Sequence, residues 1–139
     1  MDYKLELVVV PVSDVERAKA FYIDQMAFEL IVDHQPNETF RVVQLVPSGS
    51  ACAIAIGNGV NGGMEPGSIK GLHLMVTDIV AARDELVARG ADVEPIWNMG
   101  RDGVRGEGPH PEREDYGSFA GLNDPDGNLW LLQERGFHS

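Results

Sequence analysis

An internal duplication is the feature that most constrains what this chain can fold into. The tripeptide Val-Ser-Asp at residues 12–14 recurs 64 residues later as Val-Thr-Asp at 76–78, and Ala18 recurs as Ala82. In both copies an apolar, strand-like run leads into a helix that starts next to an aspartate. A chain that carries two copies of one supersecondary unit is expected to build two similar modules.

The first copy predicts a strand, a helix and three further strands. Residues 4–12 are rich in β-branched side chains, and Ser13 followed by Glu16 has the spacing of a helix capping box. Apolar residues then recur at helical spacing up to Met26. Three strand-like runs follow at about 28–33, 40–46 and 51–56, separated by turn-rich segments.

The second copy repeats this order after a turn-rich linker. A strand at 71–76 is followed by a helix at 78–89, a short strand around 92–97, and strands around 117–122 and 129–134. The segment 124–128, Asp-Pro-Asp-Gly-Asn, has ordinary turn chemistry. We therefore predict one α+β domain over residues 1–139. It consists of a first βαβββ module at 3–57, a linker at 58–69 and a second βαβββ module at 70–136, with curved mixed sheets around a cleft.

The composition bears on the partners and on the cellular location. The chain has 11 basic and 22 acidic residues, and its net charge of −11 argues against nucleic acid and anionic membrane as partners but is compatible with a cationic ligand. The single cysteine, Cys52, excludes a disulfide framework and a Cys-based zinc site. No segment has the apolar core of a signal peptide or the length of a membrane span, so we predict a cytoplasmic protein.

The ordered set of motifs resembles the vicinal oxygen chelate superfamily, which includes glyoxalase I, bleomycin-resistance proteins and extradiol dioxygenases. The motifs are the first Val-x-Asp with Phe-Tyr in its helix, the Val-x-Asp-Ile at 76–79, and Asp-Pro-Asp-Gly-Asn at 124–128 with Trp130 after it. The resemblance covers nearly the whole chain. It implies paired βαβββ modules around a U-shaped cleft, often within a homodimer.

The resemblance also indicates where a metal would bind. Metal-dependent members hold a divalent ion with His, Gln or Glu side chains from the first and last strands of each module. The matching positions here are Leu7, Ala55, Gly71 and Leu131. None of these side chains can donate to a metal, so no metal and no cofactor are expected.

His73 lies two residues beyond one of these positions, on the same face of its strand. One imidazole without converging partners is a poor metal site. Three roles stay open for His73: a histidine satisfied by a backbone group, a ligand contact, or an acid or base.

Strand alternation predicts an apolar cleft in place of the metal site. Ala51, Ala53 and Ala55 would line its concave side and leave volume for a ligand. The segment 98–116 has no apolar period and is predicted to be a lid over the cleft or a mobile, dimer-contacting loop. The predicted ligand-binding residues are His73, Met75, Trp97, His110, Tyr116, Leu131 and Gln133.

Two functions of different class follow. The first is a metal-independent, bleomycin-resistance-like protein that binds an apolar or amphipathic small molecule as a homodimer, and the net charge is compatible with a cationic one. The alternative is an enzyme, either a glyoxalase-like lyase, isomerase or dioxygenase with a rearranged metal site, or a metal-free catalyst that uses His73 or His110 as acid or base. The sequence names no catalytic residue, since it has no Ser-His-Asp order, phosphate-binding loop or activated cysteine.

Overall fold

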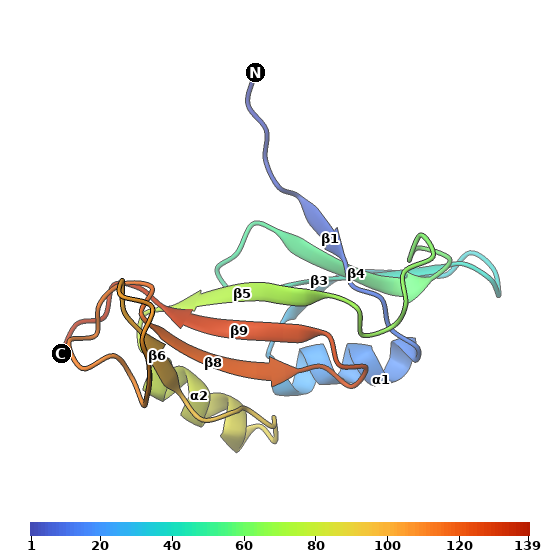
Figure 1. Ribbon diagram of the computed structural model, residues 1–139. Coiled ribbons are helices and arrows are strands. Elements are labelled where there is room, and N and C mark those ends of the chain that lie inside the picture. The colour runs from blue at the N-terminus through green and yellow to red at the C-terminus, as the bar shows by residue number, and fades with distance from the viewer. The chain divides into compact units, whose positions relative to one another are not determined.

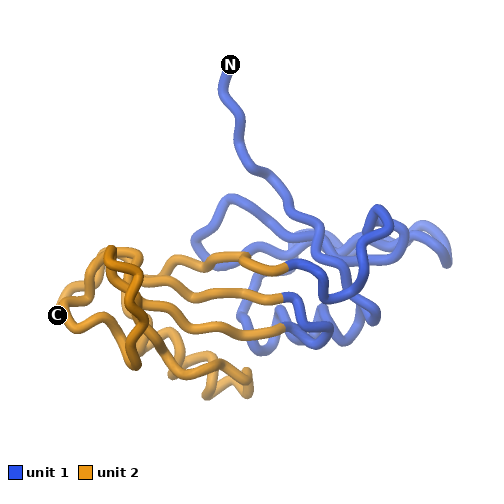
Figure 2. Tube along the Cα trace, in the orientation of Figure 1, with its two compact units in different colours: residues 1–69, 124–128 blue, residues 70–123, 129–139 orange.

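Two β-sheets and few helices make up the computed structural model, which describes residues 1–139 and confirms the predicted α+β fold. The chain divides into two compact units (Figure 2). Unit 1 consists of Met1–Ile69 and Asp124–Asn128, and unit 2 consists of Lys70–Asn123 and Leu129–Ser139. No helix has the length and apolar character needed to cross a membrane.

Unit 1 contains a four-stranded sheet in the order β1-β4-β3-β2. Its strands are β1 (Leu7–Val9), β2 (Glu29–His34), β3 (Arg41–Val46) and β4 (Ala53–Asn58). β1 runs parallel to β4 and is shorter than the predicted strand at 4–12, because its pairing with β4 starts at Leu7, opposite Ala53. Pro11, which has no amide hydrogen, then follows the strand.

The helix of unit 1 starts one residue later than the capping-box prediction. Asp14, and not Ser13, is the N-cap of α1 (Val15–Ala20), and its carboxylate accepts from the amide of Arg17 at 3.1 Å. The Ser13 hydroxyl instead donates to Asp126 at 2.6 Å. α1 continues as the π-helical turn η1 (Phe21–Gln25), which places Tyr22 in the core.

The core of unit 1 lies on the helix side of the sheet, as the alternation predicts. Val43, Leu45 and Ile56 on that side are fully buried. The prediction that alanines leave an open volume on the other side is not met. Ala53 and Ala55 are only 7% and 2% exposed, because small side chains in the middle of a sheet are covered by the larger residues of the strands beside them.

The turn Asp124–Asn128 belongs to unit 1, although the strands on either side of it belong to unit 2 (Figure 2). The Asp124 carboxylate accepts from the Tyr22 hydroxyl at 2.8 Å and from the Asn128 side-chain amide at 2.7 Å. Asn128 also donates to the Pro11 carbonyl at 2.9 Å and accepts from the Ile69 amide at 3.1 Å. The motif therefore does more than reverse the chain, since its buried side chains join three distant segments.

Unit 2 contains a five-stranded sheet in the order β5-β9-β8-β6-β7. Its elements are β5 (Lys70–Val76), α2 (Ile79–Ala88), β6 (Trp97–Met99), β7 (Arg105–Glu107), β8 (Ser118–Asn123) and β9 (Leu129–Glu134). α2 packs against β8 and β9 (Figure 1). Asp78 is the N-cap of α2, and Gly90, with φ of 91°, follows its C-cap.

The predicted loop at 98–116 contains a short hairpin of β6 and β7 at the edge of the sheet. The hairpin is held by polar side-chain bonds, since the Asn98 amide donates to the carbonyls of Glu107 and Gly108 at 3.1 and 2.9 Å. Gly106 lies opposite Asn98, and a Cβ atom there would come within 3.0 Å of the Asn98 side chain. A hairpin built this way needs no apolar alternation, which is why the sequence pattern does not predict it.

Candidate ligand-binding site

The two faces of the unit 2 sheet differ in character. Trp130, Leu132 and Glu134 of β9 are at most 2% exposed on the face that packs on α2. Leu131 and Gln133 alternate with them and therefore lie on the opposite face. Strand register adds neighbours to this second face, which we call the open face: Phe119 lies opposite Gln133, Trp97 lies opposite Phe119, and His73 and Met75 lie beside Leu131 and Gln133.

The open face brings together five of the seven predicted ligand-binding residues: His73, Met75, Trp97, Leu131 and Gln133. Met75 is 46% exposed, and His73 is exposed as well. Tyr116 is 49% exposed, and its backbone carbonyl accepts a hydrogen bond from the Gln133 side chain. His110 lies apart from it.

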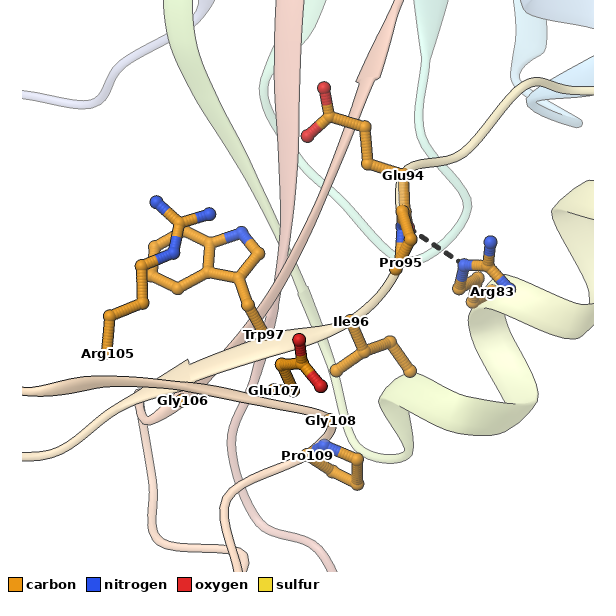
Figure 3. A pocket seen from close by; sticks show the side chains of 10 residues that line it. All are labelled: Arg83, Glu94, Pro95, Ile96, Trp97, Arg105, Gly106, Glu107, Gly108 and Pro109. Atoms are coloured by element: carbon orange, nitrogen blue, oxygen red, sulfur yellow. Dashed lines mark hydrogen bonds between the residues drawn. The ribbon is translucent and has the colours of Figure 1, made fainter.

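Trp97 forms an aromatic shelf on the open face. Its ring stacks on Phe119 with centroids 4.4 Å apart and an interplanar angle of 19°. The exposed Arg105 guanidinium lies 3.8 Å from the centroid of the same ring (Figure 3). Two flat groups this close to one ring must occupy opposite faces, so Phe119 backs Trp97 while Arg105 covers it.

Two cavities adjoin the shelf. The first, of about 990 Å³, is lined by Trp97, Arg105, Glu94 and Glu107, with Arg83 reaching from α2 to the backbone carbonyl of Glu94 at 2.8 Å (Figure 3). The second, of about 820 Å³, is lined by Phe119, Met99, Arg101 and Tyr116, among others. Both volumes lie in the range of small-molecule sites, roughly 300 to 1,000 Å³. One ring of the stacked pair therefore lines each cavity.

A hydrogen-bonded chain crosses the open face beside the shelf. The Gln133 side-chain amide donates to the Tyr116 carbonyl at 3.1 Å, and Gln133 Oε1 accepts from His73 Nδ1 at 2.8 Å. His73 is thus satisfied at one ring nitrogen by a side chain, and not by the backbone group that the sequence analysis considered.

His110 has a structural role in its turn. Its Nδ1 accepts from the Glu112 amide at 3.1 Å, so the neutral ring carries its proton on Nε2, which lies 3.6 Å from Glu114. A Cβ atom at Gly117 would approach the ring to 3.1 Å, so this glycine makes room for the imidazole. Because Nδ1 is occupied as an acceptor and Nε2 already holds a proton, the geometry disfavours His110 as a general base.

The sequence analysis missed a buried ion pair behind the site. Glu134 is fully buried, and both of its carboxylate oxygens accept from Arg113, one of them at 2.8 Å from Nε. The amide of Ile79 at the start of α2 donates to the same carboxylate at 2.9 Å. Burial alone would raise the pKa of Glu134, but the bonds from Arg113 and Ile79 outweigh burial and lower it.

This ion pair fixes the end of the segment 98–116. Arg113 and Tyr116 both adopt the left-handed backbone conformation, with φ of 51° and 66°, which non-glycine residues seldom adopt. The Tyr116 amide donates to the Glu134 carbonyl at 2.8 Å. The strained turn is thus held at two points by Glu134.

The residues present do not fit a divalent metal. Leu7 and Ala55 lie on β1 and β4 of unit 1, while Gly71 and Leu131 lie on β5 and β9 of unit 2, and none has a donor side chain. The structure contains no group of three or more His, Cys, Asp or Glu side chains that could hold a metal ion.

The family is decided by comparison with known proteins. Residues 4–132 match the family model of the Glyoxalase/Bleomycin resistance protein/Dioxygenase superfamily. The chain belongs to this superfamily. The resemblance seen in the sequence motifs is therefore confirmed.

Solved structures of the superfamily share the fold. TnmS3, an antibiotic binding protein from Streptomyces sp. CB03234, is 32% identical, with 96% of each chain covered and a TM-score of 0.72. A superfamily member from Sphaerobacter thermophilus is 29% identical, with 96% of this chain and 98% of that chain covered and a TM-score of 0.73. An uncharacterized protein of Shewanella frigidimarina is 32% identical over 129 residues, which cover 91% of this chain and 90% of that protein.

Proposed function

We propose that this superfamily member is a metal-independent binding protein for a small molecule that contains a planar aromatic group. The observation that carries the proposal is the Trp97–Phe119 stack on the open face, with a cavity on each side of it. The similarity to TnmS3, an antibiotic binding protein, supports binding of a small molecule.

The shelf is suited to stacking because one side of the Trp97 ring is already held. Phe119 is only 8% exposed and fixes the plane of the Trp97 ring. The Trp97 side chain would therefore lose little conformational freedom when a ligand binds. Arg105 belongs to the three-residue edge strand β7 and has an exposed side chain. A planar ligand would take the place of its guanidinium, or would insert between the guanidinium and the ring.

The cavity in Figure 3 also bears on the charge of the ligand. Glu94 and Glu107 line it together with Arg105. Arg83 lines the cavity as well, so two carboxylates and two guanidiniums face it, and a polar group of either charge on the ligand would find a partner there. The open face also offers apolar contacts at Met75 and Leu131. These features favour an amphipathic ligand that carries polar groups.

Replacing Trp97 with alanine tests this proposal. We expect the variant to bind a planar aromatic probe such as 2-naphthol about tenfold more weakly than the wild type, because the stacking surface is removed. Isothermal titration calorimetry measures the affinity. The matched control is Tyr3→Ala, which removes an aromatic side chain that is 89% exposed in unit 1 and should leave the affinity unchanged. Equal affinities for wild type and Trp97→Ala would contradict the proposal.

Metal independence has its own test. We expect protein grown in metal-supplemented medium to contain far less than one equivalent of metal, and Mg²⁺, Mn²⁺, Fe²⁺, Ni²⁺ and Zn²⁺ to leave the melting temperature unchanged. An ion that binds only the folded state would have to raise the melting temperature. About one equivalent of bound metal together with a clear rise would overturn this part of the proposal and favour a lyase or dioxygenase.

We also propose that the protein forms a homodimer in the cytoplasm and that the segment 98–116 acts as a lid. The resemblance supports the dimer, which sedimentation velocity would test directly. A monomer at micromolar concentration would contradict it.

A further inference from the structure

We infer that Arg105 closes over a planar ligand bound on the Trp97 ring, and that the site therefore selects neutral or electron-rich aromatic rings over cationic ones. The inference rests on the proposed function, because it concerns the same stacking surface. It names Arg105 as a residue that determines specificity, and it assigns the charge of the ring that the site accepts.

The position of Arg105 places it on the far side of a bound ring. Its guanidinium lies 3.8 Å from the centroid of the Trp97 ring, over the face that Phe119 leaves free. Trp97 and Arg105 both line the cavity of about 990 Å³ (Figure 3). A ring that enters from this cavity and stacks on Trp97 therefore meets Arg105. The order of the stack becomes Phe119, Trp97, ligand and Arg105.

The Arg105 guanidinium is free to lift from the Trp97 ring. The side chain is exposed, and it forms no ion pair, whereas Arg41 and Arg113 are each held by a carboxylate. To admit a ring, the guanidinium must move outward by one stacking distance, roughly 3.5 Å. Rotations within its own long side chain can supply this movement without any change in the core.

The backbone that carries Arg105 is held in place. Arg105 belongs to β7, which pairs with β6. The Asn98 side chain of β6 donates to the carbonyls of Glu107 and Gly108 at 3.1 and 2.9 Å. Because the strand is fixed in this way, a guanidinium that has lifted stays within reach of Trp97. It can then settle on the outer face of the inserted ring.

The charge in contact with the bound ring would be that of Arg105. The face of a neutral aromatic ring is negative and attracts a guanidinium, whereas a cationic ring would place two positive charges at stacking distance. Glu94 and Glu107 also line the cavity, but their carboxylates lie apart from the Trp97 ring (Figure 3). These carboxylates can bind a polar substituent. The net charge of −11 for the whole chain therefore does not predict the charge of the ring.

The contact between Arg105 and Trp97 can be measured without any ligand. The chain has two tryptophans, of which Trp130 is 2% exposed and Trp97 is half-buried, so acrylamide quenches mainly the fluorescence of Trp97. We expect Arg105→Ala to raise the quenching constant about twofold, because the long side chain no longer covers the indole ring. Equal quenching in the wild type and Arg105→Ala would overturn the inference.

The selectivity is measured with two planar bicyclic probes, quinoline, which is neutral at mildly alkaline pH, and 1-methylquinolinium, which carries a permanent positive charge. Arg105→Met keeps an unbranched apolar side chain but removes the guanidinium. We expect this variant to bind quinoline about threefold more weakly and 1-methylquinolinium about threefold more tightly than the wild type. The ratio of the two affinities, measured by isothermal titration calorimetry, should thus shift about tenfold toward the cation. Comparing ratios between proteins cancels the difference in hydration between the probes.

Two further variants complete this experiment. Arg101→Met removes an equal charge from the turn between β6 and β7, but Arg101 lines the second cavity, so the ratio should stay at the wild-type value. Arg105→Gln is uncharged and polar, and it should reproduce the shift seen in Arg105→Met. Melting temperatures measured alongside show that each variant is folded.

The outcomes separate the inference from the proposed function. An unchanged ratio in both Arg105→Met and Arg105→Gln, or tighter binding of quinoline by both, would overturn the inference and leave stacking on Trp97 intact. Failure of the wild type to bind quinoline at millimolar concentration would overturn the proposed function and the inference with it. Equal affinities of the wild type and Trp97→Ala for quinoline would do the same.

Discussion

Replacing Arg113 with methionine is expected to lower the free energy of unfolding by about 3 to 5 kcal/mol, because it leaves a buried carboxylate without its charged partner. Glu134 is fully buried, and Arg113 donates to both of its oxygens. Methionine retains the apolar stem of the side chain beside Phe137, whose ring lies 3.6 Å from the guanidinium. Urea unfolding at neutral pH measures the change.

The pH dependence of stability shows whether the Glu134 carboxylate causes the destabilisation of Arg113→Met. The folded-state pKa of Glu134 is lowered from 4.5, so its contribution to stability is complete above about pH 4.5 and is lost as the pH falls through the folded-state value. Without Arg113, burial raises the pKa of Glu134, and the protonated carboxyl is tolerated. The stability difference between wild type and Arg113→Met should therefore begin to narrow above pH 4.5, as Glu134 of the variant takes up a proton, and should narrow further below about pH 4.5, as the wild type loses the contribution of its ion pair.

An exposed ion pair provides the control for this prediction. Glu85 of α2 lies one turn before Arg89, the C-cap of this helix; Glu85 Oε1 and Arg89 Nε are 3.7 Å apart, and the two side chains are 68% and 41% exposed. Glu85→Gln should change the free energy of unfolding by no more than about 0.5 kcal/mol, because water screens such a pair. If Arg113→Met were no more destabilising than Glu85→Gln, the structural role assigned to Arg113 would be wrong.

Replacing Asn128 with alanine is expected to lower the free energy of unfolding by about 3 kcal/mol, because two buried groups and one half-buried amide each lose a hydrogen bond. The Pro11 carbonyl and the Asp124 carboxylate each lose a donor, and the Ile69 amide loses its acceptor. Asn128 itself is fully buried, so water cannot replace these bonds without opening the structure. Chemical unfolding followed by circular dichroism measures the loss.

Asn37→Ala is the matched control for Asn128→Ala. Asn37 also takes part in three hydrogen bonds through its side chain, from the amide and hydroxyl of Thr39 and from the amide of Phe40, but it is exposed. Water can satisfy the same groups in that variant, so we expect a loss of about 1 kcal/mol or less. Equal losses in the two variants would show that burial of the Asp124–Asn128 turn contributes nothing.

The element order and the family follow from local patterns in the chain. Period-two runs place strands at β3, β4, β5 and β9, and the aspartates of the repeat become the N-caps Asp14 and Asp78. The lack of metal-donor atoms in the side chains of Leu7, Gly71 and Leu131 can likewise be read from the sequence, because it depends on the residue type alone. The β6–β7 hairpin is not visible, since Asn98 holds it through bonds to main-chain carbonyls.

The sequence by itself therefore determined the two-sheet α+β fold, the superfamily and the absence of donor side chains at Leu7, Ala55, Gly71 and Leu131. Only the tertiary structure decided the partners of His73, Glu134 and Asn128. His73 meets Gln133 across 60 residues, Arg113 meets Glu134 across 21, and Asn128 meets Pro11 across 117. The protonation of an imidazole and the cost of a buried charge depend on these distant contacts, and such contacts exist only once the strands have paired.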